Sequence, residues 1–246
     1  MVFFSAKNLM NELQTVVLTG IGVIQPQDGA RRLDDFALEN YLESQKTYLD
    51  RCSALALAGA AVALRDAKIA WPVEGGEEFG VTLGTHLGCV DTMKGFWKNV
   101  AEKGVRLATP LLFSHSYVNS PISLCAIEFG LKGYHSTVCA GKNSGLEAVR
   151  AAYDAIRLGH AQAMLCGGVE ALTPTHELCE TGYLSEASVF FVLESVQHAQ
   201  ARGIENAREM SDALLEAAAQ DDLIAERFGD CGGATGALAL WRSPNC

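Results

Sequence analysis

Short apolar runs bounded by turn residues recur along the chain. Val16-Val17-Leu18 is rich in β-branched residues and is followed by Gly20 and Gly22. A run of this length between turn residues indicates a buried strand, and we expect the strand to end at these glycines. Four further runs have the same character, at residues 79–83, 134–139, 163–166 and 189–193.

Longer segments with helical character alternate with these runs. Residues 51–68 are rich in alanine and contain no proline, which predicts a close-packing helix. Residues 144–158 place their apolar side chains on one stripe, and Gly159 ends this predicted helix. Residues 91–103 predict an exposed helix. Residues 116–129 predict another, in which Asn119-Ser120-Pro121 supplies a cap and an N1 proline. Two more helices are predicted at 205–227 and after the glycine turn of the last segment, GDCGGATGALALW.

The alternation of strands and helices predicts the fold class. It indicates an α/β domain with a mostly parallel, buried sheet. The 246 residues contain no internal repeat and no low-complexity linker. This length is at the upper end for one domain, so we expect a single domain over residues 1–246.

Composition and charge exclude several classes of function. The net charge of −10 disfavours a phosphate-backbone partner. No stretch reaches roughly 18 uninterrupted apolar residues, so no membrane span is expected. The start of the chain, MVFFSAKNLMNELQ, has no long apolar region of a signal peptide. The sequence therefore predicts a cytoplasmic protein with no nucleic-acid partner and no membrane partner.

The eight cysteines are scattered and form no CxxC pair. This spacing argues against structural zinc and against a redox dithiol. We interpret the cysteines as mostly buried, reduced thiols, and we expect no metal and no cofactor.

Five segments, in order, carry a resemblance to a known family. They are VVLTGIGVI, GVTLGTHLG, LLFSHSYVNSPISLCAIEFGLKG, the block at 133–170, and FVLESVQHAQARG. Over roughly residues 14–203 the chain resembles the N-terminal half of β-ketoacyl synthases. The resemblance implies a thiolase-like layered fold in which the second half is largely missing.

The family's active centre is a strand, the motif Thr-Ala-Cys-Ser/Thr-Ser-Gly, and a helix. In the family a Gly-Pro lies nine residues before the cysteine and a helix-ending glycine lies 17 residues after it. Gly133 and Gly159 have this spacing from Lys142, which therefore stands at the nucleophile position. Cys139 is the alternative nucleophile, but it lies three residues early, and we interpret it as a buried core cysteine. A cation is poorly placed at a helix N-terminus, which argues for a role of Lys142.

The family's two catalytic histidines come from its C-terminal half. Its His-Gly-Thr-Gly-Thr motif has no counterpart here, and the six histidines are isolated in sequence. The segment GDCGGATGA matches the spacing of the second motif, Gly-His-x-x-Gly-Ala-x-Gly-Ala, with Asp230 in place of the histidine. This match implies that residues 205–246 are a remnant of the C-terminal half. Only residues 173–182 stand where the family has a long loop over the site.

The resemblance also implies an interface and a tunnel. In the family, the strand before the nucleophile pairs with its counterpart across a two-fold axis. In the family, residues that line the acyl pocket precede the interface helix. At these positions this chain has the bulky Tyr117 and Phe113, as expected of a gate that closes the tunnel. The alternative for Tyr117 is an ordinary core position. The predicted interface strand consists of Tyr134, His135, Ser136, Thr137, Val138 and Cys139.

Three functions are compatible with these residues. The first is a non-catalytic subunit similar to a chain length factor. It would pair with a full-length, active β-ketoacyl-ACP synthase in type II polyketide or fatty acid-type chain elongation. It would meet acyl carrier protein through that complex. The short length most resembles the synthase-like proteins of aryl polyene pigment clusters. The second is an independent acyltransferase or decarboxylase that uses Cys139 or Lys142. The third is a structural or regulatory protein without a tunnel.

Overall fold

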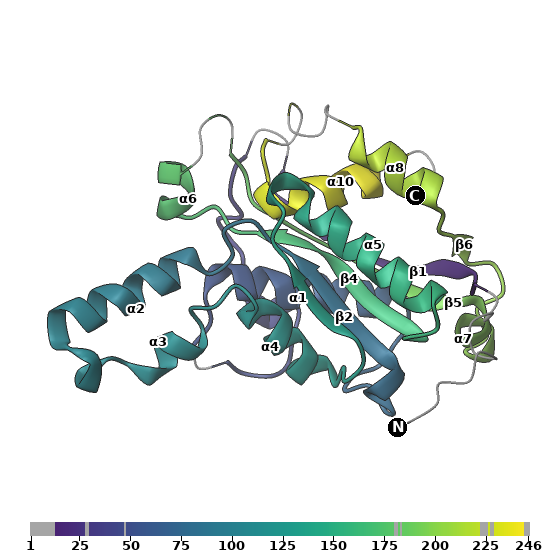
Figure 1. Ribbon diagram of the computed structural model, residues 1–246, viewed down its shortest axis with the longest axis horizontal. Helices are drawn as coiled ribbons and strands as arrows, with labels where there is room; N and C mark the ends of the chain where they lie inside the picture. Colours follow the sequence, from purple (N-terminus) through teal and green to yellow (C-terminus); the bar gives the residue numbers. More distant parts are fainter. Residues whose placement is uncertain are drawn as a thin grey trace, which may run out of the picture.

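The computed structural model describes residues 13–27, 30–46, 48–179, 182, 184–221, 226 and 229–243. Its centre is a six-stranded sheet with the order β3-β2-β4-β5-β1-β6 (Figure 1). The strands are β1 (Val16–Ile24), β2 (Phe79–Gly84), β3 (His135–Val138), β4 (Ala163–Glu170), β5 (Ala187–Ser195) and β6 (Arg208–Glu209). The first twelve residues, predicted to hold no signal peptide, and Cys246 lie outside the described part.

The sheet is mixed, so the expectation of a mostly parallel sheet is wrong. Strand β2 pairs in parallel with β3 and with β4. Strands β4 and β5, β5 and β1, and β1 and β6 pair antiparallel. An apolar run indicates that both faces of a strand are covered, but the path of the connection decides the strand direction. The chain leaves β4 and enters β5 at the same end of the sheet, without crossing it.

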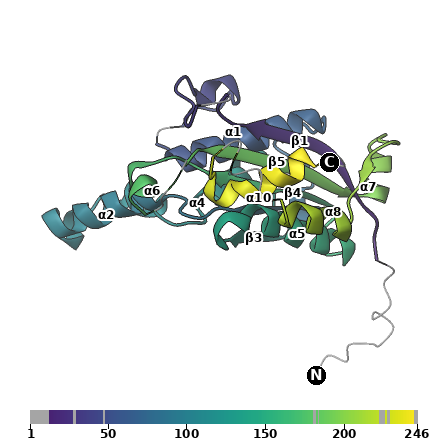
Figure 2. The ribbon, with the colours of Figure 1, turned by 90° about the horizontal axis from the view of Figure 1, so that it is seen from above.

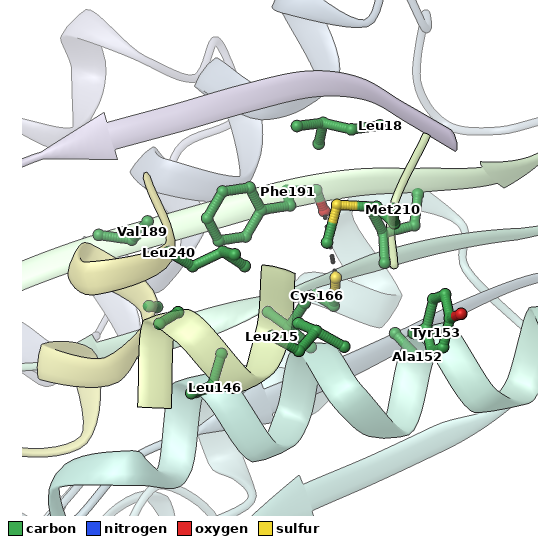
Figure 3. Close-up of a cluster of buried hydrophobic side chains, with 14 of the residues drawn as sticks. Leu18, Leu146, Ala152, Tyr153, Cys166, Val189, Phe191, Met210, Leu215 and Leu240 are labelled. Carbon is green, nitrogen blue, oxygen red and sulfur yellow. Dashed lines mark hydrogen bonds between the residues drawn. The ribbon is translucent and has the colours of Figure 1, made fainter. Parts of the chain in front are cut away.

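Helices cover both faces of the sheet. Helices α1 (Arg51–Asp66) and α4 (Ser120–Phe129) pack on one face, while α5 (Ser144–Arg157), α8 (Asp212–Ala219) and α10 (Thr235–Arg242) pack on the other (Figure 2). Each face has its own buried apolar cluster. In the cluster under α5, Phe191 of β5 and Cys166 of β4 lie together with side chains of α5, α8 and α10 (Figure 3). The result is a three-layer α/β/α arrangement.

Strand β1 runs through the glycines that were expected to end it. A Cβ atom added at Gly22 would lie 2.2 Å from the carbonyl oxygen of Gly59, and one at Gly20 would lie 2.5 Å from that of Ala63. The glycines therefore allow α1 to lie directly on the sheet. The many alanines of α1 have short side chains, which allow the same close approach of the helix to the sheet.

Most of the predicted helices are present. Helix α2 (Val90–Lys103) is exposed as expected and buries only Thr92, and the start of α4 follows Asn119. The remaining helices are α3 (Pro110–Ser114), α6 (Pro174–Cys179) and α7 (Val196–Ala201), with 3-10 turns η2 (Leu38–Asn40), η3 (Gly76–Glu78), η4 (Val105–Leu107), η5 (Gly141–Asn143) and η6 (Gly232–Ala234). No helix in the described part of the chain is long and apolar enough to cross a membrane.

The helix predicted over 205–227 is wrong in its first part. Residues Arg208–Glu209 form β6 and pair with β1, and α8 begins only at Asp212. The Ser211 side chain accepts a hydrogen bond from the backbone N–H of Leu214 and so caps α8. The polar face of the segment was compatible with a longer helix, but pairing with a sheet edge took precedence. Residues 222–225 and 227 of the prediction lie outside the described part.

A buried carboxylate ties β5 to the chain that follows it. Glu194 is fully buried and accepts hydrogen bonds from Thr19 Oγ1 (2.5 Å), His198 Nδ1 (2.5 Å) and the Arg202 guanidinium (2.9 Å). Burial alone would raise the pKa of Glu194, but the bonds from His198, Arg202 and Thr19 outweigh it and lower that pKa to about 2.

We predict that Glu194 stabilises the fold above pH 4.5 and that this contribution is lost as the pH falls towards 2. The folded pKa lies below the ordinary value of 4.5, so the unfolded chain binds the proton first as the pH falls. The shift corresponds to about 3 kcal/mol. Urea unfolding at a series of pH values measures it. Glu194→Gln is less stable at neutral pH but should have a flatter profile between pH 4.5 and 2, and an unchanged slope would contradict the assignment.

Candidate functional site

The turn between β3 and α5 holds Lys142. The Ser144 hydroxyl accepts a hydrogen bond from the Ala140 N–H (2.8 Å) and donates one to the Gly141 carbonyl (2.6 Å). Gly141 has φ +67°, a conformation that favours glycine. These contacts close a tight turn at the start of α5, with Lys142 in η5 and its side chain 61% exposed. The expected strand–turn–helix geometry around Lys142 is present.

The structure brings together the two positions that the sequence pattern selected separately. Lys142 Nζ lies 2.7 Å from Asp230 Oδ2, although 88 residues separate them. The Asp230 side chain is only 13% exposed, and its other oxygen accepts from the Gly232 N–H (3.0 Å) and from Thr235 Oγ1 (3.4 Å). The carboxylate is therefore held at the start of η6 and α10 while it pairs with the lysine.

Two helix N-termini meet at this ion pair. A Cβ atom at Gly145 would lie 2.8 Å from Gly168 Cα and 2.8 Å from the Gly233 carbonyl oxygen. The first turns of α5 and of the η6–α10 segment thus contact each other and β4 at glycine positions. The positive end of a helix favours an anion, so the site suits the Asp230 carboxylate. Asp230 in turn compensates the unfavourable position of the Lys142 ammonium.

Glu170, at the end of β4, organises the surroundings of this pair and was not identified from the sequence. Its buried carboxylate accepts hydrogen bonds from the backbone N–H groups of His86 (2.6 Å), Leu87 (3.1 Å), Gly88 (3.0 Å) and Gly233 (2.9 Å). It therefore fixes both the GTHLG turn and the η6–α10 segment. The available signal was a charged residue two positions after Gly168, at the end of a buried apolar run.

Cys139 is exposed, so its interpretation as a buried core cysteine is wrong. It follows β3, which is an edge strand and leaves one side of its chain uncovered. Partial burial and the nearby Glu170 carboxylate raise the pKa of the Cys139 thiol, which favours the unreactive protonated form. The interpretation of mostly buried thiols is otherwise confirmed, for Cys52, Cys89, Cys125, Cys166 and Cys231, while Cys179 is exposed.

The histidines have separate environments. His176 is buried and its Nδ1 lies 3.3 Å from the Ala171 carbonyl oxygen, while His198 bonds to Glu194. His115 packs edge-on against Tyr48, and His135 is exposed on β3. Among the described residues, no group of three His, Cys, Asp or Glu side chains has the geometry to hold a metal ion.

The short segment in place of the family's covering loop forms α6. Thr175 hydrogen-bonds to Asp91 of α2, and the Arg31 guanidinium pairs with Glu177 at 2.9 Å. Residues 180, 181 and 183 lie outside the described part. The described residues of this segment therefore connect α2 to the loop that follows β1.

Phe113 lies in α3 and Tyr117 follows that helix, and α2 and α3 project to one side of the sheet (Figure 1). The rings of Tyr117 and Phe113 are 51% and 47% exposed and meet edge-on at 5.1 Å, and Phe113 also contacts Phe96 at 5.4 Å. Tyr117 is thus not an ordinary core aromatic within this chain. About half of the Tyr117 surface can therefore contact another molecule.

The predicted interface strand forms one edge of the sheet. Strand β3 pairs with β2 on one side, and it is the outermost strand described on the other. His135 is exposed, Ser136, Thr137 and Val138 are half-buried, and Tyr134 before the strand is 41% exposed. An edge of this kind presents unpaired backbone groups to a partner strand.

Comparison with known proteins identifies the class. The family of the β-ketoacyl synthase N-terminal domain matches residues 15–187. The chain therefore belongs to the β-ketoacyl synthase family.

Individual relatives agree with this assignment. The chain is 30% identical to the tetracenomycin polyketide synthase ketoacyl synthase alpha subunit of Streptomyces glaucescens over 194 residues, which cover 65% of this chain and 45% of the relative. The curated relatives are longer proteins, and the chain spans 39% to 50% of the lengths of three that it matches.

Solved structures place the fold in the thiolase-like class. A β-ketoacyl synthase from Burkholderia phymatum STM815 has a TM-score of 0.74 and 20% identity, with 93% of this chain and 85% of that chain covered. The ishigamide ketosynthase/chain length factor has a TM-score of 0.68 and 23% identity over 80% of this chain and 61% of that chain. The thiolase-like α/β fold expected from the resemblance is confirmed.

We predict that Glu170→Gln destabilises the protein far more than Lys142→Met. Either orientation of the glutamine amide places an NH₂ group against two backbone N–H donors, which should cost at least about 3 kcal/mol. Loss of the exposed Lys142 partner should cost less than about 1 kcal/mol. Urea unfolding of both variants measures the difference. Equal losses would contradict the prediction, because they would give the ion pair the same weight as Glu170.

Proposed function

We propose that this chain is a non-catalytic subunit, similar to a chain length factor, that pairs with an active β-ketoacyl-ACP synthase in type II polyketide or fatty acid-type chain elongation. The observation that carries the proposal is the Lys142–Asp230 ion pair. It occupies the two positions at which the resemblance expects the nucleophilic cysteine and a catalytic histidine. Residues 205–246 would then be a remnant of the family's C-terminal half.

The chemistry of the pair argues against condensation. A Claisen condensation in this family needs a thiolate to carry the acyl chain and imidazoles to stabilise the enolate and the oxyanion. An ammonium paired with a carboxylate has no lone pair with which to attack a thioester. Asp230 also places a negative charge where negative charge would develop in the reaction. The active synthase partner would therefore carry out the chemistry.

The β3 edge supports a partner of the same family. Two such edges can pair across a two-fold axis and continue the sheet, which satisfies the backbone groups of both strands. Among the similar structures, one contains a ketosynthase/chain length factor, and another contains a type II acyl-carrier protein in complex with its ketosynthase. We infer that this chain meets acyl carrier protein only through its synthase partner. A narrower proposal, which rests on the family resemblance alone, is that the synthase works in aryl polyene biosynthesis.

A second candidate is an independent acyltransferase or decarboxylase that uses Cys139 or Lys142. The exposure of Cys139 favours access of a thioester to its sulfur. The raised pKa of the same thiol opposes attack. The subunit function is favoured because it needs no base or oxyanion partner at either residue.

We predict that the chain alone acquires no acyl group, because neither the Lys142 ammonium nor the protonated Cys139 thiol is a competent nucleophile. The test is intact-protein mass spectrometry after incubation with an acyl-carrier-protein thioester, with an active synthase as the positive control. A stoichiometric adduct that Cys139→Ala or Lys142→Met removes would establish the second candidate instead.

We predict that the chain forms a heterodimer with the synthase when the two are co-expressed, which size exclusion would detect. An obligate interface of this type should bury above about 2,000 Å² in total. A stable lone chain that ignores the synthase would contradict this prediction.

We predict that Tyr117→Ala in the reconstituted complex gives longer products while the heterodimer stays intact. A ring that closes the tunnel resists an extra two-carbon unit, since repacking costs about 1–3 kcal/mol. The half-exposed position of Tyr117 means that the isolated chain should keep its stability. Product lengths are measured by mass spectrometry, and Tyr117→Phe, which retains the ring, should leave them unchanged. An unaltered distribution from the folded alanine variant rules out the gate.

A further inference from the structure

A cavity of about 290 Å³ lies at the start of β2. Phe79, the first residue of β2, lines this cavity, whereas the other end of the strand leads into the turn that Glu170 binds. A six-residue strand spans roughly 20 Å. The cavity is therefore separate from the candidate site. Its volume is at the lower end of the range of pockets that hold small molecules, about 300–1,000 Å³.

Charged side chains of both signs line the cavity, and they come from three separate segments. Lys68 follows α1, Glu74 and Glu78 lie in the loop and the η3 turn before β2, and Arg202 follows α7. Gly75, with φ +66°, turns the chain between the two glutamates, and both reach the same cavity. A simple anion would meet the carboxylates, and a simple cation would meet the lysine and the arginine. The walls therefore favour a ligand that carries both charges.

Lys68 stands where the end of a helix usually has glycine. Its φ of +56° is the single positive φ of a non-glycine residue in the described part of the chain. The Lys68 N–H donates to the Arg65 carbonyl (3.0 Å) and the Ile69 N–H to that of Leu64 (2.9 Å), which are the bonds that close a helix around a left-handed residue. A side chain is strained in this conformation, and such strain is concentrated at functional sites. Lys68 is exposed, so burial of its side chain does not account for the strain.

The wall formed by α7 and Arg202 is fixed before any ligand enters. The Arg202 guanidinium donates from Nε and Nη2 to Glu194 (2.9 Å each) and from Nη2 to the Ala67 carbonyl oxygen (3.0 Å). His198, which also lines the cavity, bonds through Nδ1 to the same carboxylate. These bonds leave Arg202 Nη1 and His198 Nε2 as the atoms that can meet a ligand. Side chains that are already held in place lose little entropy on binding.

An apolar floor completes the cavity. Ile69 and Val73 are partly buried against the apolar cluster on the α1 face, and Phe79 is only 4% exposed. All three residues line the cavity. The backbone of this floor is tied to α4, since the Val73 N–H donates to the Phe129 carbonyl oxygen (2.8 Å). The cavity therefore offers a rigid nonpolar surface beside groups of both charges.

We propose that this cavity binds a free α-amino acid with an apolar side chain. Lys68 and Arg202 bind the carboxylate of the ligand, Glu74 and Glu78 bind its ammonium group, and the apolar floor covers its side chain. A ligand without the ammonium group would leave the two glutamates without a partner. The inference does not rest on the proposed function, because all of the lining residues belong to this chain and none belongs to the candidate site.

Isothermal titration calorimetry of the full chain with L-leucine, L-valine and L-phenylalanine tests the site. At least one of these amino acids should bind saturably below about 10 mM. The leucine analogues 3-methylbutylamine and 4-methylpentanoate each lack one charged group. They should bind at least about 10-fold more weakly than leucine, because each leaves one set of charged side chains unpaired. Equal binding of either analogue, or no saturation by any of the amino acids, would overturn the proposal.

Variants separate recognition of the ligand from folding. Lys68→Gly removes the ammonium group and relieves the left-handed conformation. It should weaken binding at least about 10-fold while the melting temperature stays the same or rises. Glu74→Gln should weaken binding similarly, whereas the matched changes Lys94→Gln and Glu102→Gln on the exposed helix α2 should leave the affinity unchanged. Undiminished binding by Lys68→Gly would refute the site. A lower melting temperature of that variant would also refute it, because the lysine would then serve the fold.

Discussion

The buried carboxylate of Glu170, hydrogen-bonded to four backbone N–H groups, holds the candidate site together. Two of its bonds reach Leu87 and Gly88 in the turn after β2, and another reaches Gly233 in the segment that begins α10. These segments are far apart in sequence, and this one group bonds to both of them. A buried charge is tolerated because each of its oxygens accepts from backbone donors. The position of Asp230, three residues before Gly233, follows from this arrangement.

Under the proposed function, the site keeps the architecture of the family's catalytic centre while its chemistry has changed. The first turns of α5 and of the η6–α10 segment still converge at glycine contacts, as a site that stabilises negative charge requires. In this chain the negative charge is Asp230, a residue of the protein itself, and Lys142 compensates it. A charge that is permanently present gains nothing in a transition state, because only differential stabilisation accelerates a reaction. The same geometry therefore favours a structural role.

The two faces of the sheet differ in how they are covered, and this bears on assembly. On the face under α5, residues of α10 from Thr235 to Leu240 are buried, because α5, α8 and the sheet surround that helix. At one edge of the sheet, β3 is uncovered, and residues of α2 and α3 such as Trp97 and Phe113 are exposed. Under the proposed function, a partner strand would satisfy the free backbone groups of β3.

The sequence by itself determined the order of most elements and the place of Lys142 between a strand and a helix, because apolar runs, glycine turns and motif spacing are local properties. Spacing also selected Asp230. Only the tertiary structure decided that these two residues meet, that Cys139 is exposed on an edge strand, and that Glu170 joins two distant segments. The tertiary structure likewise decided the strand directions, since an apolar run of residues is compatible with a parallel or an antiparallel strand. Those features depend on which segments pack against each other, which no local pattern of residues encodes.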